Sequence, residues 1–208
     1  MMKKLMMFSS IFILLFVCAG STSRAALIFS DNFDSYTPGI PWLTWAGTNW
    51  SVSDGSVDLI GEGTSWNLIP GHGLYVDMDG STNDAGKITS ILISMNPGDY
   101  ILSYDVAGNQ RDGGDDSVIV QVGGGSLVDT TTTAGQNAPF TTISIPFTIG
   151  TAIAASISFD GVGSDNVGLL LDNVAINSVE NIIPAPGAIL LGSIGISLVG
   201  LLRRRGTL

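Results

Sequence analysis

The sequence predicts an all-β protein, an antiparallel β-sandwich that lies between two terminal membrane signals. Two observations predict the sandwich. Apolar residues recur at every second position through the middle of the chain, in short runs separated by glycine, proline and aspartate. No stretch between residues 27 and 178 combines apolar spacing near 3.6 with helix caps. About eight to ten short strands, each with one buried face, need a second sheet to cover that face.

Residues 1–25 are typical of a secretory signal peptide. Two lysines at positions 3 and 4 precede an apolar stretch from Leu5 to Gly20, and small residues follow up to Ala25. We expect cleavage after Ala25. The single cysteine, Cys18, lies in the part that is removed. The mature protein is therefore expected to have no disulfide, no thiol chemistry and too few ligands for a zinc site.

The segment between the two terminal signals is strongly acidic. Residues 26–181 carry all eighteen acidic residues and only two basic ones, Lys87 and Arg111. They are therefore more acidic than the whole chain, whose formal net charge is −10. Nucleic acid and anionic membrane surfaces are excluded as partners, because phosphate binding needs a cationic face. Bound divalent cations or simple solvation would offset the repulsion.

The first clear strand pair is expected around Asp54 and Gly55. Apolar alternation on both sides, in Trp50–Ser53 and Ser56–Leu59, predicts a hairpin with a two-residue primed turn. Pro97-Gly98 opens a later strand, Gly123–Gly125 closes one, and the acidic, glycine-rich segment 108–117 is expected to be a loop. Further strands are expected where apolar residues alternate, in Tyr100–Val106, Val118–Val122, Ile143–Phe147 and Ile153–Phe159.

The last strand carries an acidic residue, Asp172, among apolar ones. The register with Leu170 inward buries Asp172, whereas the register with Leu171 inward exposes it. A buried carboxylate without a partner costs several kcal/mol. A calcium ion shared with Asp31 or Asp34 near the first strand would offset this cost, since calcium prefers oxygen ligands. The alternatives are that Asp172 caps a bulge or accepts backbone N–H bonds.

Four tryptophans, Trp42, Trp45, Trp50 and Trp66, fall within one 25-residue window. The position of Trp50 in the expected hairpin favours a core role. Trp42 and Trp45 lie in a loop-like segment and are candidates for carbohydrate binding, because an exposed indole stacks against a sugar ring. The alternative for both is packing in the core.

Catalysis has little support in the sequence. His72 is the only histidine, it lies in a turn, and no nucleophile-elbow motif accompanies it. Among eighteen acidic residues any pair can be chosen for glycoside cleavage, so no pair is informative. We therefore expect no catalytic residues and no enzyme activity.

The C-terminal residues 184–208 have three parts in a fixed order. They are a proline motif (Pro184, Ala185, Pro186), an apolar run from Gly187 to Leu202, and a basic cluster (Arg203, Arg204, Arg205). A helix over residues 185–202 would be about 27 Å long, close to the roughly 30 Å of a bilayer core. The arginines are expected to stay cytoplasmic, so the preceding residues lie outside. An ordinary anchor and a buried core helix are the alternatives.

This order of motif, helix and basic end resembles the PEP-CTERM sorting tail of Gram-negative bacteria. The resemblance implies recognition and cleavage by an exosortase-type membrane protease. The chain departs from the pattern at Ala185, where the family usually has glutamate.

A second resemblance covers most of the acidic segment. The sequences DNFDSYTPG (31–39), GLYVDMDGSTNDAGKITS (73–90), PGDYILSYDVAG (97–108) and GLLLDNVAI (168–176) resemble secreted bacterial jelly rolls of the galactose-binding-like class. Many of these are carbohydrate-binding modules. The resemblance implies a jelly-roll domain over residues 26–177 and a linker over 178–183. It also implies a structural calcium ion where the first and last strands meet, with Asp31, Asp34 and Asp172 as ligands.

Together these features predict an exported, surface-sorted, non-catalytic sandwich in the extracellular polysaccharide matrix, first anchored in the inner membrane by one C-terminal helix. Weak glycan binding is the expected activity. A structural or adhesive surface protein without a small ligand is the alternative, and a secreted glycoside-active enzyme is the third possibility.

Overall fold

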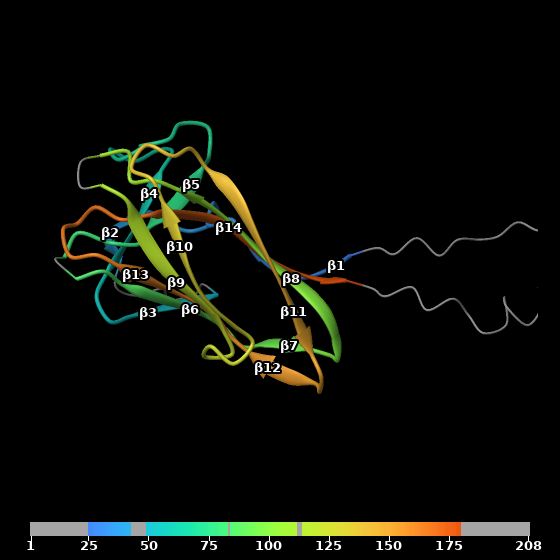
Figure 1. Ribbon diagram of the computed structural model, residues 1–208. Coiled ribbons are helices and arrows are strands. Elements are labelled where there is room, and N and C mark those ends of the chain that lie inside the picture. Colours follow the sequence, from blue (N-terminus) through green and yellow to red (C-terminus); the bar gives the residue numbers. More distant parts are fainter. Residues whose placement is uncertain (1–24, 43–48, 83, 112–113, 180–208) are drawn as a thin grey trace, which may run out of the picture. The chain divides into compact units, whose positions relative to one another are not determined.

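The computed structural model describes residues 25–42, 49–82, 84–111 and 114–179 (Figure 1). The prediction of an antiparallel two-sheet sandwich is confirmed, and the described residues contain strands and no helix. Within these ranges no helix has the length and apolar character needed to cross a membrane. The predicted signal peptide (1–25, apart from residue 25) and sorting tail (184–208) lie outside the described residues.

The described ranges contain fourteen strands. In chain order they are β1 (Ala26–Asp31), β2 (Gly39–Trp42), β3 (Trp50–Ser53), β4 (Val57–Gly61), β5 (Leu74–Asp77), β6 (Lys87–Ser90), β7 (Ile93–Met95), β8 (Gly98–Ala107), β9 (Asp116–Val122), β10 (Val128–Ala134), β11 (Thr141–Ile149), β12 (Ile153–Ala155), β13 (Ile157–Val162) and β14 (Leu170–Val179). The last strand thus continues two residues into the segment 178–183 that was expected to be a linker.

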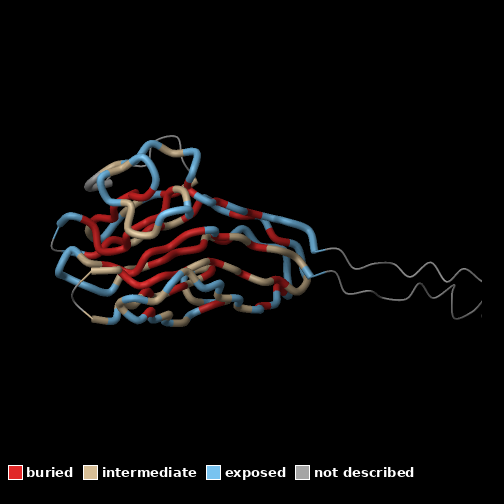
Figure 2. The backbone as a smooth tube through the Cα atoms, turned by 90° about the horizontal axis from the view of Figure 1, so that it is seen from above, coloured by how far each residue is buried: buried red, intermediate tan, exposed pale blue. Residues whose placement is uncertain are grey.

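Two sheets form the layers of the sandwich (Figures 1 and 2). The larger has the order β11-β8-β14-β5-β4-β2, and β1 pairs with the C-terminal part of β14. The smaller has the order β10-β9-β13-β6-β3, and a separate two-stranded ladder joins β7 and β12. Alternate residues of β8 and β9, such as Leu102, Tyr104 and Val120, are fully buried between the layers. The period-two pattern therefore identified these core residues correctly.

The hairpin expected around Asp54-Gly55 is not formed. The turn itself has the left-handed backbone expected of it, with φ of 54° at Asp54 and 124° at Gly55. However, β3 pairs with β6 in one sheet and β4 pairs with β2 and β5 in the other. Ser56 bonds instead to the β5–β6 connection, where its N–H donates to the Asp84 carbonyl at 3.0 Å and its carbonyl accepts from Gly80 N–H at 3.0 Å. These bonds to another segment direct the chain across to the second sheet.

Trp50 lies in the core, as its position in the sequence predicted. Its side chain is 4% exposed and packs edge-on against Phe29, with ring centroids 5.8 Å apart. Its indole N–H donates to the Asp31 carboxylate at 3.0 Å. The first strand is therefore tied to the smaller sheet by one aromatic side chain.

Asp172 on β14 lies in neither of the two environments expected from the sequence. Leu171 faces the core between the sheets, so Leu170 and Asp172 lie on the outer face, the face of the larger sheet turned away from the smaller sheet. The ladder to β8 then shifts between Asp172 and Ala175, with φ of 50° at Asn173. Yet Asp172 is only 2% exposed. The expectation that this register would expose it is wrong, because the outer face is itself covered.

The connection between β4 and β5, residues 62–73, provides much of this cover. Tyr75 is fully buried, and its hydroxyl accepts hydrogen bonds from the N–H groups of Leu68 at 2.6 Å and Ile69 at 2.9 Å. Phe140 packs against the Tyr75 ring at 5.6 Å and against His72 at 4.7 Å. A second apolar cluster thus forms on the outer face, separate from the core between the sheets.

Candidate functional site

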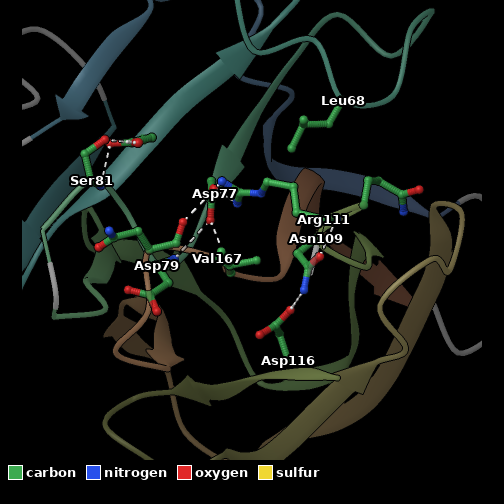
Figure 3. A network of polar contacts seen from close by, with 12 residues as sticks. Leu68, Asp77, Asp79, Ser81, Asn109, Arg111, Asp116 and Val167 are labelled. Carbon is green, nitrogen blue, oxygen red and sulfur yellow. Dashed lines mark hydrogen bonds and ion pairs between the residues drawn. The ribbon is translucent and has the colours of Figure 1, made fainter. Parts of the chain in front are cut away.

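A pocket of about 230 Å³ opens on the outer face, beside this second apolar cluster. Its lining comes from β4, β5 and four connections, and consists of Asp58, Ile60, Trp66, Asp77, Ser81, Arg111 and Asn166. We call it the Trp66 pocket. Figure 3 shows the polar network below it, in which the side chains of Asp77 and Arg111 point toward each other.

Two carboxylates lie side by side in this pocket. Asp58 and Asp77 are directly opposite each other in the β4–β5 ladder, where like charges are destabilising. Each carboxylate has its own hydrogen-bond donors, which offset the repulsion. The Arg111 guanidinium donates to Asp77 Oδ2, while Ser81 donates its hydroxyl to Asp58 Oδ2 at 2.6 Å and its N–H to Asp58 Oδ1 at 3.2 Å. The pocket therefore presents both acceptors and a cation within one small surface.

The backbone holds Asp77 in place as well. Its Oδ1 accepts hydrogen bonds from Asp79 N–H at 3.2 Å and Gly168 N–H at 3.0 Å. A Cβ at Gly168 would lie 2.6 Å from that oxygen and 2.2 Å from the Asp79 nitrogen, so this position requires glycine. Burial raises the pKa of Asp77 to about 7, and the charge and hydrogen bond of Arg111 oppose this rise.

Further acids surround this pair at the same end of the sandwich. Asp79 is 1% exposed; its Oδ2 accepts from Asp165 N–H at 3.1 Å, and its Oδ1 has no partner among the described residues. Burial raises the pKa of Asp79, and it also raises the pKa of Asp116. The charge of Asp165 adds to both rises, and Arg111 opposes them. The Arg111 guanidinium therefore lowers the pKa of three carboxyl groups, those of Asp77, Asp79 and Asp116.

Trp66 gives the pocket an apolar wall. Its side chain is 48% exposed, although it is one of the largest side chains in the protein. An exposed indole beside paired hydrogen-bonding groups suits a ring with one C–H face and polar edges, which is the character of a pyranose. The volume lies below the roughly 300–1,000 Å³ of typical small-molecule sites, which favours a single sugar residue over a long chain.

The tryptophans chosen from the sequence as sugar ligands are not placed together by the described structure. Trp42 ends β2 and is opposite Val57 in the ladder to β4, so its backbone belongs to a strand and not to the loop expected from the sequence. Its side chain and the whole of Trp45 lie outside the described residues. Their role in carbohydrate binding stays a prediction.

The three predicted calcium ligands lie near the junction of β1 and β14, but their carboxylate oxygens accept hydrogen bonds from different donors. Asp31 accepts from Phe33 N–H at 2.9 Å, from the Tyr36 hydroxyl and from Trp50. Asp34 accepts from Leu74 N–H at 2.7 Å.

Among the described residues, Asp172 accepts hydrogen bonds only from its neighbour Asn173, from the N–H at 2.7 Å and the side-chain amide at 3.1 Å. Burial raises the pKa of Asp172 to about 7, with further contributions from Asp34, Asp105 and Asp31. Within the described ranges no three His, Cys, Asp or Glu side chains are arranged to hold a metal ion. The calcium site stays a prediction.

Sequence reasoning missed the Trp66 pocket. Asp77 ends β5 and Asp79 lies two residues beyond it, and both side chains are buried. The signal in the sequence that could have indicated this pocket was that residues 26–181 contain only two basic residues. Lys87 pairs with Asp160 at 3.1 Å in a half-exposed bridge, whereas Arg111 reaches a buried acid. An arginine alone in a glycine-rich acidic loop indicated a buried partner.

No protein-family model matches the chain, and no curated protein is significantly similar to it. Solved structures do match. The tandem of CBM22-1 and CBM22-2 domains from Paenibacillus barcinonensis Xyn10C is 13% identical with a TM-score of 0.51, over 81% of this chain and 50% of that one. This likeness supports the fold alone, a sandwich of the kind found in carbohydrate-binding modules.

Other solved structures are similar with lower TM-scores. The CBM22-1 xylan-binding domain of the same Paenibacillus enzyme has a TM-score of 0.47 at 14% identity, over 77% of this chain and 99% of that one. The exo-β-1,3-galactanase of Phanerochaete chrysosporium has a TM-score of 0.42 at 20% identity, over 62% of this chain. The chain spans only 27% of that enzyme's length.

Proposed function

We propose that this protein binds glycan weakly through the Trp66 pocket, as a non-catalytic module exported to the cell surface. The observation that carries this proposal is the half-exposed indole beside Asp58, Asp77 and Arg111 in one pocket. The indole would stack on the C–H face of a sugar ring. The charged groups would bond to its hydroxyls, with Arg111 as donor and the carboxylates as acceptors. A shallow site of this size suits weak binding, strengthened by many copies on one surface.

The arrangement of the two acids favours binding over catalysis. A glycosidase needs one carboxylic acid that gives its proton to the leaving oxygen and one carboxylate that attacks or activates water. Both oxygens of Asp58 accept from Ser81, and both oxygens of Asp77 accept from Arg111 or the backbone. These partners hold the carboxylates in fixed positions as acceptors.

Affinity electrophoresis of the mature chain through gels that contain soluble polysaccharides tests the proposal, after a glycan array has identified candidates. Trp66→Ala is expected to abolish retardation. Val162→Ala is the matched control, because Val162 is 52% exposed and does not line the pocket. Trp42→Ala and Trp45→Ala test the alternative site. If no variant changes retardation, the structural or adhesive role becomes the better explanation.

The same preparations test the enzymatic alternative. The mature chain is expected to release no reducing ends from any polysaccharide that it retains. Release that disappears in Asp58→Asn would overturn the non-catalytic interpretation and assign Asp58 a chemical role.

Surface sorting is proposed from the C-terminal sequence. If residues 184–208 act as a sorting tail, the chain is anchored once and an exosortase-type protease then releases a smaller form into the polysaccharide matrix. Replacement of Arg203, Arg204 and Arg205 by alanine is expected to reduce membrane retention or processing, measured by cell fractionation and blotting. An unchanged distribution would contradict the tail's role.

A further inference from the structure

The exposed apolar side chains of the sandwich gather at one end. Among the described residues, eight large hydrophobic side chains are exposed, and six of these lie on or next to the ends of β1, β7, β12 and β14. The six are Leu27, Ile28, Ile91, Leu92, Ile153 and Val179. We call this set the apolar end. Leu27 and Leu92 are 61% and 69% exposed, among the most exposed of all.

The ladders show that these positions belong to one end. Gly98, at the start of β8, is opposite Ile149, and the short strands β7 and β12 directly precede and follow this point in the sequence. Val179 is opposite Asp99 in the β14–β8 ladder. Ala26 is opposite Ser178, so the chain enters and leaves the sandwich at this same end (Figure 1).

The opposite end of the sandwich is acidic. The connections there carry Asp54, Asp79, Asp84, Asp115 and Asp165, and the Trp66 pocket lies next to them. Near the apolar end, the described acids are Asp99 on β8 and Asp129 on β10, and Asp99 accepts a hydrogen bond from Thr148 at 2.7 Å. The sandwich therefore has an acidic end and an apolar end. Scattered exposed hydrophobics need no explanation, but a segregated set does.

We propose that the apolar end contacts the lipid bilayer, an inference that rests on the proposed anchoring of the chain by its C-terminal segment. That apolar segment begins at Gly187, only eight residues after Val179. Eight extended residues reach at most about 28 Å. A bilayer that holds residues 187–202 therefore lies within this distance of Val179, and of the apolar side chains around it.

Charge and chemistry both fit lipid as the partner. Leucine, isoleucine and valine side chains partition into the interface between headgroups and acyl chains without a specific ligand. An acidic surface would be repelled by anionic lipid, but this repulsion is smallest where the acids are fewest. Contact at the apolar end would orient the acidic end and the Trp66 pocket away from the membrane, toward the polysaccharide.

Single-cysteine labelling of the mature chain tests the contact, because the sequence from residue 26 onward contains no cysteine. Ser94 on β7 and Ser53 on β3 are both exposed and lie at opposite ends of the sandwich. Ser94→Cys and Ser53→Cys would each carry an environment-sensitive fluorophore, in neutral phosphatidylcholine vesicles with headgroup-level spin-labelled lipid. We expect at least about threefold more quenching at position 94, and Leu27→Ser with Leu92→Ser should remove the difference.

Each other outcome overturns the proposal and identifies the reason. If the protein does not float with vesicles, the anchoring itself has failed, and the lipid contact fails with it. If it floats but both labels are quenched equally weakly, the anchoring is intact and the apolar end does not touch lipid. A label at position 94 that is shielded from aqueous iodide but not reached by the lipid quencher indicates that a second copy covers this end.

Discussion

Two buried carboxylates on the outer face of the same sheet have different surroundings. Asp77 on β5 and Asp172 on β14 are each 2% exposed, and burial raises the pKa of each to about 7. Asp77 has a guanidinium and two backbone N–H groups as partners and lies beside an exposed indole. In the part of the chain that the structure describes, Asp172 has hydrogen bonds only from the neighbouring Asn173, and the charges of Asp34, Asp105 and Asp31 lie near it. Burial alone therefore does not distinguish the two carboxylates, whereas the fixed donors around Asp77 and the pocket that it lines do.

The comparison predicts that removing the Arg111 guanidinium has the largest effect on the free energy of unfolding. Arg111→Ala leaves Asp77 buried without its counter-charge, so the free energy of unfolding should fall by about 3 kcal/mol or more. Urea unfolding measures the change. Lys87→Ala is the matched control, because the Lys87–Asp160 bridge is half-exposed and should contribute no more than about 1 kcal/mol. Equal losses in the two variants would show that Asp77 does not depend on Arg111.

The next largest effect is expected from calcium at Asp172. If Asp172 shares an ion with Asp31 or Asp34, saturation at a hundred times the dissociation constant stabilises the chain by about 2.7 kcal/mol. Chelation should then lower the melting temperature, and Asp172→Asn should abolish this dependence while the sandwich stays folded. Melting curves that coincide in calcium and in chelator would refute the site. Asp77→Asn serves as the control, because its carboxylate is already occupied by protein donors.

A smaller effect is expected from pH in the absence of calcium. The folded pKa of Asp172 is raised to about 7 from 3.8, so the native state binds its proton more tightly than the unfolded state does. The resulting stability is complete below about pH 4 and is lost as the pH rises to about 7. The melting temperature should therefore fall between pH 5 and pH 8, by the few degrees that about 1–2 kcal/mol produces.

Asp172→Asn should flatten this profile, and saturating calcium should do the same in the native chain, because the ion favours the charged carboxylate. Asp77 contributes with the same sign, so part of the slope should survive in the variant. A profile that rises from pH 5 to pH 8 would contradict both raised pKa values.

The smallest effect on stability is expected from Trp66→Ala. Because the indole is 48% exposed, its loss should change the free energy of unfolding by less than about 1 kcal/mol while glycan retention is lost. Trp50→Ala provides the contrast, since a buried tryptophan costs about 3–5 kcal/mol. If Trp66→Ala destabilises the chain as much as Trp50→Ala, the indole supports the cover of the outer face and is not free for a ligand.

The sequence predicted the parts of the fold that depend on local alternation. The strands around Leu102, Val120 and Phe159 followed from period two alone, because residues facing one core must alternate. The path after Asp54-Gly55 could not be predicted this way. A two-residue turn sets local backbone angles, whereas hydrogen bonds between Ser56 and the distant β5–β6 connection decide which sheet receives the strand.

The Trp66 pocket was unpredictable for a related reason. Leu68 and Ile69, in residues 62–73, pack against an apolar cluster on a face that a simple sandwich leaves exposed, and this segment has no strand pattern. The bulge at Asn173 shifts the register of β14, and the sequence offered a bulge at Asp172 only as one of several alternatives. The composition was the one indication of a buried ion pair, because residues 26–181 contain two basic residues and eighteen acidic ones.

The position of β14 also has a mechanical consequence. It is the last described strand, ten residues long, and it is bonded to β8 along one side and to β1 and β5 along the other. Suppose that a force pulls the C-terminal end of β14 while the acidic end of the sandwich is held in place. This force acts along the axis of the strand. Such a force shears many hydrogen bonds at once and does not open them one at a time. If the proposed anchoring and glycan binding hold, tension between the membrane and the polysaccharide would therefore load many hydrogen bonds of β14 together.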